Sequence, residues 1–116
     1  MAGFPLQNLT VDVSTTPSGG IGTGGAFDLS EFETVSVAGH VDNYTPNQTG
    51  LTIILQFQLE DGTFENYQTI ATVGNGSANI PEQTFNAPFQ AARISWNVGS
   101  AGGATGTFEV SVWGEK

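Results

Sequence analysis

The chain has 116 residues, and eleven acidic side chains against two basic ones give it a formal net charge of −9. This length predicts a single domain with a hydrophobic core. Arg93 and Lys116 cannot neutralise a nucleic-acid backbone or hold the chain to an anionic membrane, so we expect neither as a partner. The absence of cysteine excludes disulfides and cysteine-ligated zinc. Met1–Leu6 has no basic or apolar leader pattern, so we expect no signal peptide.

Alternation of apolar and polar residues predicts strands along most of the chain. The first is expected at Leu9–Val13, and Ser14–Gly25 after it is rich in Gly, Thr and Ser, which is typical of a flexible linker or an extended arm. We therefore expect an N-terminal strand and arm over residues 1–25 and a sandwich domain over residues 26–116. The later strands are expected at Ala26–Leu29, Phe32–Val41, Leu51–Leu59, Phe64–Val73, Ala78–Thr84, Ala92–Val98 and Thr107–Trp113.

The turns between these segments favour one fold class. Asp61-Gly62 marks a tight hairpin, because glycine accepts the positive φ that such turns require. Other Gly-rich turns recur along the chain, and no segment keeps a helical period for three turns. Short strands about every ten residues predict an all-β fold, an antiparallel β-sandwich that is jelly-roll-like and carries a Gly-rich N-terminal arm.

Nucleophilic catalysis would have to use His40, the only histidine in the chain. Ser36 and Asp42 lie at even spacing from it on one strand, which places them about 6–7 Å apart per step on a common face. We therefore expect His40 to be a polar surface residue. No nucleophile motif is present, and we expect no enzyme activity and no catalytic residue.

Acidic residues suggest two further kinds of site. Glu31 with Glu33, and Glu60 with Glu65 across the hairpin turn, are paired carboxylates of the kind that glycosidases use. The Glu60–Glu65 turn also offers oxygen ligands that suit calcium. Acids are common at turns and strand edges, where they keep a sheet soluble, so we expect solvated side chains, no metal and no cofactor.

Aromatic residues give the alternative of sugar binding by stacking. Tyr44, Tyr67 and Trp113 are the candidates that could lie outside the core, whereas Trp96 alternates with apolar neighbours and is expected inside it. Trp and Tyr also commonly fill sandwich cores with one polar edge hydrogen-bonded. Both readings stay open from the sequence.

Two segments carry a resemblance to a known class of proteins. Phe57–Tyr67, with the sequence FQLEDGTFENY, resembles the hairpin of small phage structural β-sandwich proteins, and Phe89–Trp96, with the sequence FQAARISW, resembles their arginine-containing strand. The similarity covers about Phe32 to Trp113 and is closest to capsid decoration (cement) proteins. It implies a trimer on the outside of the virion that binds the major capsid protein and uses no cofactor.

The resemblance also implies adhesive contacts from apolar residues that the core does not need. Phe4, Leu6, Ile21 and Phe27 in the N-terminal region are the candidates, with ordinary core or edge packing as the alternative. The other function in view is a carbohydrate-binding or host-recognition module of a phage tail fibre or baseplate, which would use the exposed aromatic residues.

Overall fold

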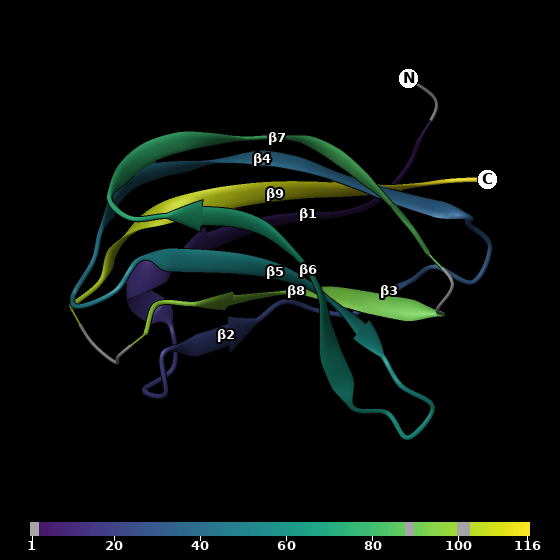
Figure 1. The fold of residues 1–116 in the computed structure, drawn as a ribbon, viewed down its shortest axis with the longest axis horizontal. Coiled ribbons are helices and arrows are strands. Elements are labelled where there is room, and N and C mark those ends of the chain that lie inside the picture. Colours follow the sequence, from purple (N-terminus) through teal and green to yellow (C-terminus); the bar gives the residue numbers. More distant parts are fainter. Residues whose placement is uncertain (1–2, 88–89, 100–102) are drawn as a thin grey trace.

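A computed structural model of the chain, which describes residues 3–87, 90–99 and 103–116, consists mainly of strands (Figure 1). The strands are β1 (Phe4–Asp12), β2 (Ile21–Thr23), β3 (Phe27–Asp28), β4 (Thr34–Thr45), β5 (Leu51–Gln58), β6 (Phe64–Val73), β7 (Gly76–Asn86), β8 (Ala91–Asn97) and β9 (Thr105–Glu115). One short 3-10 helix, η1 (Val13–Thr15), follows β1. No helix in the described ranges is long and apolar enough to cross a membrane.

The strands form two antiparallel sheets. The first sheet has the order β1-β9-β4-β7, and the second has the order β2-β8-β5-β6, with β3 also paired to β8. The chain crosses repeatedly between the sheets, so that β1 and β9, the first and last strands, lie side by side (Figure 1). This strand order is that of a jelly roll, which confirms the predicted all-β, antiparallel β-sandwich.

The core lies between the sheets and follows the predicted alternation. Val35 and Val37 of β4, and Leu51, Ile53 and Leu55 of β5, are fully buried. The pattern ends at Leu59, the last residue of the strand predicted over Leu51–Leu59, which is 39% exposed. β5 ends at Gln58, before Leu59, and the hairpin between β5 and β6 bends away from the first sheet (Figure 1).

The Gly-rich N-terminal segment differs from the expected arm. β1 pairs with β9 along its length, and the Asp12 carboxylate begins η1 by accepting a hydrogen bond from the Ser14 amide at 3.0 Å. β2 then pairs with β8, where a Cβ on Gly22 would lie 2.3 Å from the Trp96 ring. Because Gly22 has no side chain, the Trp96 ring packs directly on the backbone of β2. The described part of this segment therefore belongs to both sheets and does not extend away from them.

Candidate attachment groove

A large concave surface lies where β1 begins and β9 ends. A groove of about 790 Å³, here called the end groove, opens there between the edges of the two sheets. Its volume falls within the range of roughly 300–1,000 Å³ that is usual for ligand sites. The larger apolar residues that line it are Phe4, Pro5, Leu6, Phe27 and Phe32, and the charged ones are Asp28, Glu31, Glu115 and Lys116.

Two phenylalanines form an aromatic pair in the end groove. The ring centroids of Phe4 and Phe32 are 5.9 Å apart, and their planes are tilted by 31°. Phe4 is 61% exposed, whereas Phe32 is half-buried. A Cβ on Gly114 would lie 2.6 Å from the Phe32 ring, so this glycine lets the ring rest on the backbone of β9. Apolar surface is thereby presented to solvent in a concave setting.

The turn between β3 and β4 holds Phe32 in position. The Asp28 carboxylate accepts a hydrogen bond from the Ser30 amide at 2.8 Å, and the Phe32 amide donates to the Leu29 carbonyl at 3.0 Å. Leu29 is only 1% exposed and anchors the turn in the core. The hydrogen bonds from Ser30 lower the pKa of the Asp28 carboxyl group. Asp28 is therefore ionised at neutral pH.

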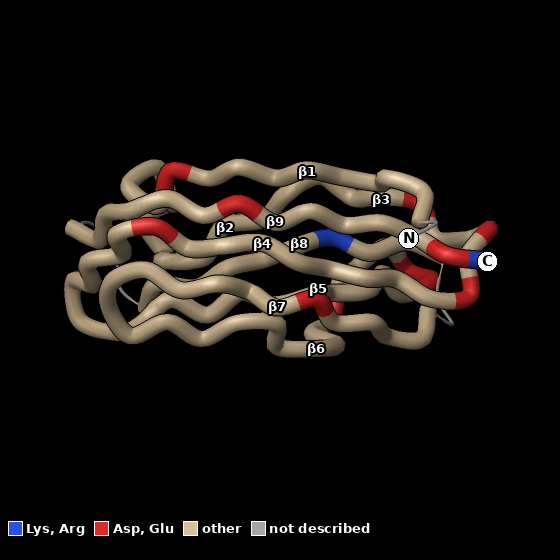
Figure 2. The backbone as a smooth tube through the Cα atoms, turned by 90° about the horizontal axis from the view of Figure 1, so that it is seen from above, with Lys and Arg blue, Asp and Glu red and all other residues tan. Residues whose placement is uncertain are grey.

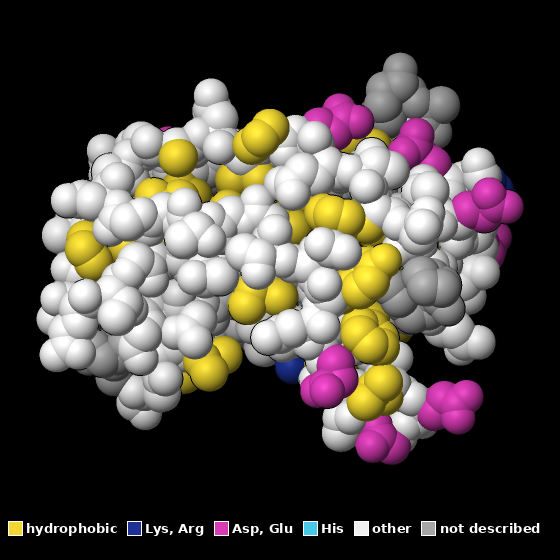
Figure 3. Space-filling view, in the orientation of Figure 1, with side chains coloured by type: hydrophobic (Ala, Val, Ile, Leu, Met, Phe, Trp, Pro, Cys, Tyr) yellow, Lys and Arg dark blue, Asp and Glu magenta, His cyan; other side chains and the backbone are white. Residues whose placement is uncertain are grey.

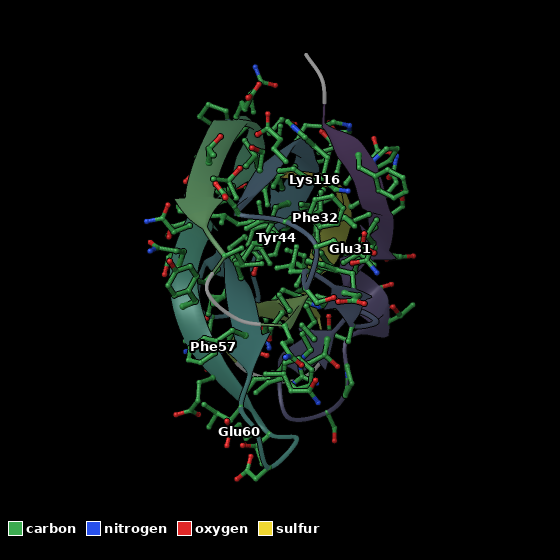
Figure 4. All side chains as sticks on the ribbon, turned by 90° about the vertical axis from the view of Figure 1, so that its right-hand side faces the viewer. Glu31, Phe32, Tyr44, Phe57, Glu60 and Lys116 are labelled. Carbon is green, nitrogen blue, oxygen red and sulfur yellow. The ribbon has the colours of Figure 1, made fainter. Side chains whose placement is uncertain are left out.

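The rim of the end groove is acidic. Three carboxylates and one ammonium group line it, and acidic residues gather at this end of the molecule (Figure 2). Lys116 Nζ lies 3.8 Å from Glu31 Oε1, and about three quarters of each side chain is exposed. Such exposed ion pairs contribute only about 0–1 kcal/mol to stability, so Lys116 is bound only weakly to the Glu31 carboxylate. Figure 4 looks onto this end, with Glu31, Phe32 and Lys116 close together.

Three of the four predicted adhesive residues meet at this groove. Phe4 and Leu6 of β1 and Phe27 of β3 all line it. Phe27 is only 7% exposed and belongs to the core cluster, so it forms the floor and is not a free contact residue as we expected. Ile21 is 53% exposed but pairs with Asn97 at the far end of β8, away from the groove.

The sequence pattern does not identify Phe32 as a groove residue, because it predicts a strand that begins at this residue. The structure begins that strand at Thr34 and leaves Phe32 in the preceding turn. The available signal was its position between Glu31 and Glu33, since an apolar residue flanked by two acids is poorly suited to a buried strand.

Tyr44, the first candidate for sugar stacking, is a core residue. It is 1% exposed, and its hydroxyl group donates a hydrogen bond to the Thr49 carbonyl at 2.9 Å. Burial raises the pKa of the Tyr44 phenol. A ring without an exposed face cannot stack on a sugar, so the expectation that Tyr44 lies outside the core is wrong.

Tyr67 and Trp113 lie on different sheets. Tyr67 is half-buried in an aromatic row, with edge-to-face contacts to Phe57 at 5.9 Å and to Phe85 at 6.4 Å between ring centroids. On the face of the molecule that Figure 3 shows, a line of hydrophobic side chains ends near a group of acidic side chains. Trp113 is half-buried on the outer face of the first sheet, where it lines a groove of about 380 Å³ with Asn8. The structure does not bring the three candidates together.

The side chains around His40 do not form a nucleophilic triad. His40 Nδ1 lies 2.7 Å from Asp42 Oδ2, and Nε2 lies 3.1 Å from Glu109 Oε1. Hydrogen bonds to these two carboxylates raise the pKa of His40, with the bond to Glu109 the larger cause. The Ser36 hydroxyl is instead within hydrogen-bond distance of Thr84 Oγ1 at 2.7 Å. With both ring nitrogens occupied by carboxylates, the histidine has no contact through which it could activate that serine.

The acidic hairpin turn is closed by its own hydrogen bonds. Asp61 Oδ1 accepts hydrogen bonds from the Thr63 amide at 3.0 Å and the Thr63 hydroxyl at 2.7 Å, which lower the pKa of the carboxyl group. Glu60 and Glu65 are exposed, as are Glu31 and Glu33. Across residues 3–87, 90–99 and 103–116, no three His, Cys, Asp or Glu side chains are grouped to hold a metal ion.

Comparisons with known proteins extend the description of the fold. The sequence matches no protein-family model and no curated protein. It is similar in structure to a protein of Bacillus endospore appendages, which form a family of disulfide-linked pili. The TM-score is 0.52, and the identity is 18% over 100% of this chain and 93% of that chain. At this level of identity the similarity establishes a shared β-sandwich fold.

Weaker similarities are found to viral and carbohydrate-binding structures. A chain of infectious bursal disease virus, Gt strain, has a TM-score of 0.49 and 16% identity over 91% of this chain and 30% of that chain. A family 16 carbohydrate-binding module has a TM-score of 0.46 and 14% identity over 93% of this chain and 82% of that chain.

Proposed function

We propose that this protein is a non-catalytic structural protein that attaches to a larger protein assembly through the end groove. The observation that carries the proposal is Phe4, which is 61% exposed and rests against Phe32 in a concave, partly apolar site. Aromatic side chains that become buried in such pockets commonly supply most of the free energy of an interface. Each Å² of apolar surface removed from water adds about 25 cal/mol.

The finer proposal is a capsid decoration protein on the outside of a phage head. Its support is the resemblance of the β5–β6 hairpin and of β8 to phage structural proteins, together with the jelly-roll fold. The partner would be the major capsid protein. The pilus-forming appendage protein of similar fold is in keeping with an assembly role. This chain has no cysteine and therefore forms no disulfide with a partner. Many weak contacts on one shell can add up to strong attachment.

Sedimentation with empty phage shells that lack decoration proteins tests the proposal. The wild-type protein should sediment with the shells, and Phe4→Ser or Leu6→Ser should weaken binding by about tenfold or more, as expected for loss of a central apolar contact. Leu59→Ser is the matched control, because Leu59 is also exposed but does not line the groove. Wild-type protein that stays in the supernatant, or groove variants that bind like the control, would refute the proposal.

Point substitutions are preferable to truncation for this test. Removing residues 1–25 would delete β1 and β2, which belong to the two sheets, and would expose the edges of β9 and β8. A loss of binding after such a truncation would not distinguish damage to the fold from loss of the groove. Both Phe4 and Leu6 can be changed while the β1 backbone stays paired with β9.

The resemblance also leads us to propose a homotrimer. Ile21 on β2 is 53% exposed and lies away from the groove, so it is the apolar residue that we assign to contacts between copies. Sedimentation velocity should give a trimer for the wild type and smaller species for Ile21→Ser. A wild-type protein that stays monomeric at high micromolar concentration would contradict this assignment.

Carbohydrate binding is the second candidate function. It is favoured by Trp113, whose neighbours in the 380 Å³ groove include Asn8 and Ser111, a combination of an aromatic ring with amide and hydroxyl groups that suits sugars. A glycan array would show specific binding that Trp113→Ala abolishes and Phe4→Ser leaves intact. Array signals that are unchanged in Trp113→Ala would exclude this groove as their source.

A further inference from the structure

We infer that the end groove receives a segment of a different protein in which apolar side chains are flanked by Lys or Arg. The inference rests on the proposed function and specifies the chemistry of the partner. Two independent features of the groove support it, namely an apolar interior and an acidic rim with a weakly held lysine.

The interior defines the apolar part of the partner. Phe27 forms a floor that is part of the core, whereas Phe4 and Leu6 line the β1 side of the groove. Phe32 lies against Phe4 and is half-buried. A volume of about 790 Å³ has room for more than one side chain of the size of Leu or Phe. A partner without apolar side chains would leave this surface wet and would gain little from the contact.

The rim defines the charged part. Asp28 and Glu31 are exposed acids on one side of the groove, and Glu115 lies at the end of β9 on the other. Glu115 Oε1 accepts a hydrogen bond from the Ser36 hydroxyl at 3.1 Å, so its charge is held at this end of the sheet. Lys116 opposes these charges only through its long contact of 3.8 Å with Glu31. A cationic side chain on the partner can therefore displace Lys116 from Glu31 and gain the carboxylate.

A second copy of the chain does not meet these requirements. Each copy carries a net charge of −9 and only two basic residues. The Arg93 guanidinium lies 3.9 Å above the Phe64 ring, and its Nε donates a hydrogen bond to Gln56 Oε1 at 2.8 Å, so Arg93 is already engaged within its own sheet. Lys116 belongs to the groove rim itself. Two grooves that faced each other would bring like charges together, which is unfavourable.

Short synthetic peptides provide the probe. The test peptide has a Leu-Phe core flanked on both sides by lysine and arginine. One control peptide replaces the basic residues with glutamate, and another keeps the charges and replaces the core with serine. Titration into isotopically labelled protein, followed by NMR, should show only the first peptide binding, with shifts confined to the groove. Raising the ionic strength from about 0.01 to 0.1 M, which shortens the screening length from about 30 to 10 Å, should weaken that binding.

Variants of the rim give opposite expected effects. Glu31→Gln should weaken binding of the basic peptide about two- to fivefold, as expected for loss of one exposed charge contact. Lys116→Gln should strengthen it by a similar factor, because the competing cation is gone. The matched control is Glu65→Gln with Glu82→Gln, since both residues are exposed acids that do not line the groove. This control should leave peptide affinity within the error of the wild type.

The outcomes separate this inference from the proposed function. Glutamate or serine-core peptides that bind as well as the basic one, absence of binding, or no gain in Lys116→Gln would overturn the inference. Groove-dependent dimerisation, lost in Phe4→Ser, would show that a second copy is the occupant and would also overturn it. Shell binding that needs Phe4 but ignores salt and Glu31→Gln would leave attachment intact and refute only the basic partner. Peptide binding without shell binding would refute only attachment to shells.

Discussion

The two ends of the sandwich differ in how far their aromatic side chains are buried. At one end Tyr44 of β4 is 1% exposed, and its hydroxyl is bonded to the Thr49 carbonyl. At the other end Phe32, just before the same strand, lies half-buried beside Phe4, which is 61% exposed. β4 therefore runs from an end where the Tyr44 ring is part of the core to an end where the Phe4 ring is exposed to solvent beside Phe32.

A glycine packs closely at each end, and the two glycines contact different kinds of atoms. A Cβ on Gly106 would lie 2.8 Å from the Tyr44 Cα and 2.9 Å from the Asn43 carbonyl oxygen, so backbone meets backbone at the Tyr44 end. A Cβ on Gly114 would instead meet the Phe32 ring, a side chain that can move. At the Tyr44 end, here called the closed end, main chain packs against main chain. At the groove end, here called the open end, main chain packs against the Phe32 side chain.

Tyr44→Ala and Phe4→Ala test the comparison with the largest expected effect. Tyr44→Ala should lower the free energy of unfolding by about 3–5 kcal/mol, because it removes a fully buried aromatic ring and leaves a cavity. Phe4→Ala should change it by no more than about 0.5 kcal/mol, since most of its ring is already in water. Urea denaturation measures both values.

Tyr44→Phe is the control that separates packing from hydrogen bonding. It keeps the ring and removes only the hydroxyl bond to Thr49, which should cost about 0.5–1.5 kcal/mol. If Phe4→Ala destabilises the protein as much as Tyr44→Ala does, the groove end is part of the core and the contrast between the ends disappears.

Glycine substitutions at the two ends should give a smaller, graded effect. Gly106 has a φ of +126°, so Gly106→Ala combines backbone strain with a clash against backbone atoms and should cost about 1–3 kcal/mol. Gly114→Ala should cost less, because the Phe32 ring can shift into the groove. Gly19→Ala is the control, since among the described residues no atom beyond its chain neighbours lies within 4 Å of its Cβ position. Thermal melts that rank Gly114→Ala as the worst of the three would contradict a movable ring at the open end.

The fold could be predicted from the sequence because its signals are local. Alternation placed Leu51, Ile53 and Leu55 in the core, and the expected strand Phe64–Val73 matches the bounds of β6. The role of the Gly-rich segment could not be predicted in this way. Nothing in the sequence around Gly22 indicates that it contacts Trp96, because the fold alone brings the two residues together.

The site was predictable only in part, for reasons that lie in particular residues. Phe4 and Leu6 could be named because they precede the first predicted strand, but the contact of Phe32 with Gly114 joins distant parts of the chain. The burial of Tyr44 could not be predicted, because the pairing of β4 with β7 shifts between Val41 and Tyr44, where Asn43 has a φ of +55°. Such a bulge inserts one residue and turns the next side chain to the opposite face.

The smallest expected effect concerns His40, which lies on β4 between the two ends. The bonds to Glu109 and Asp42 raise its pKa above the ordinary value of 6.5, so the protonated form is favoured in the folded state. This contribution to stability is fully present below the unfolded pKa and is lost as pH rises through the folded one. Because the chain has a single histidine, a fall in melting temperature from about pH 6 to about pH 8 that His40→Gln abolishes isolates this contribution.

The same titration shows whether the two ends are independent. His40 lies on the outer face of the first sheet, bonded to Asp42 on β4 and Glu109 on β9, and it lines neither the end groove nor the packing around Tyr44. Deprotonation should therefore lower the melting temperature without changing the salt dependence or the affinity of groove binding measured at about pH 6 and about pH 8. A groove affinity that follows the titration of His40, and loses that dependence in His40→Gln, would show that β4 couples the sheet face to the open end.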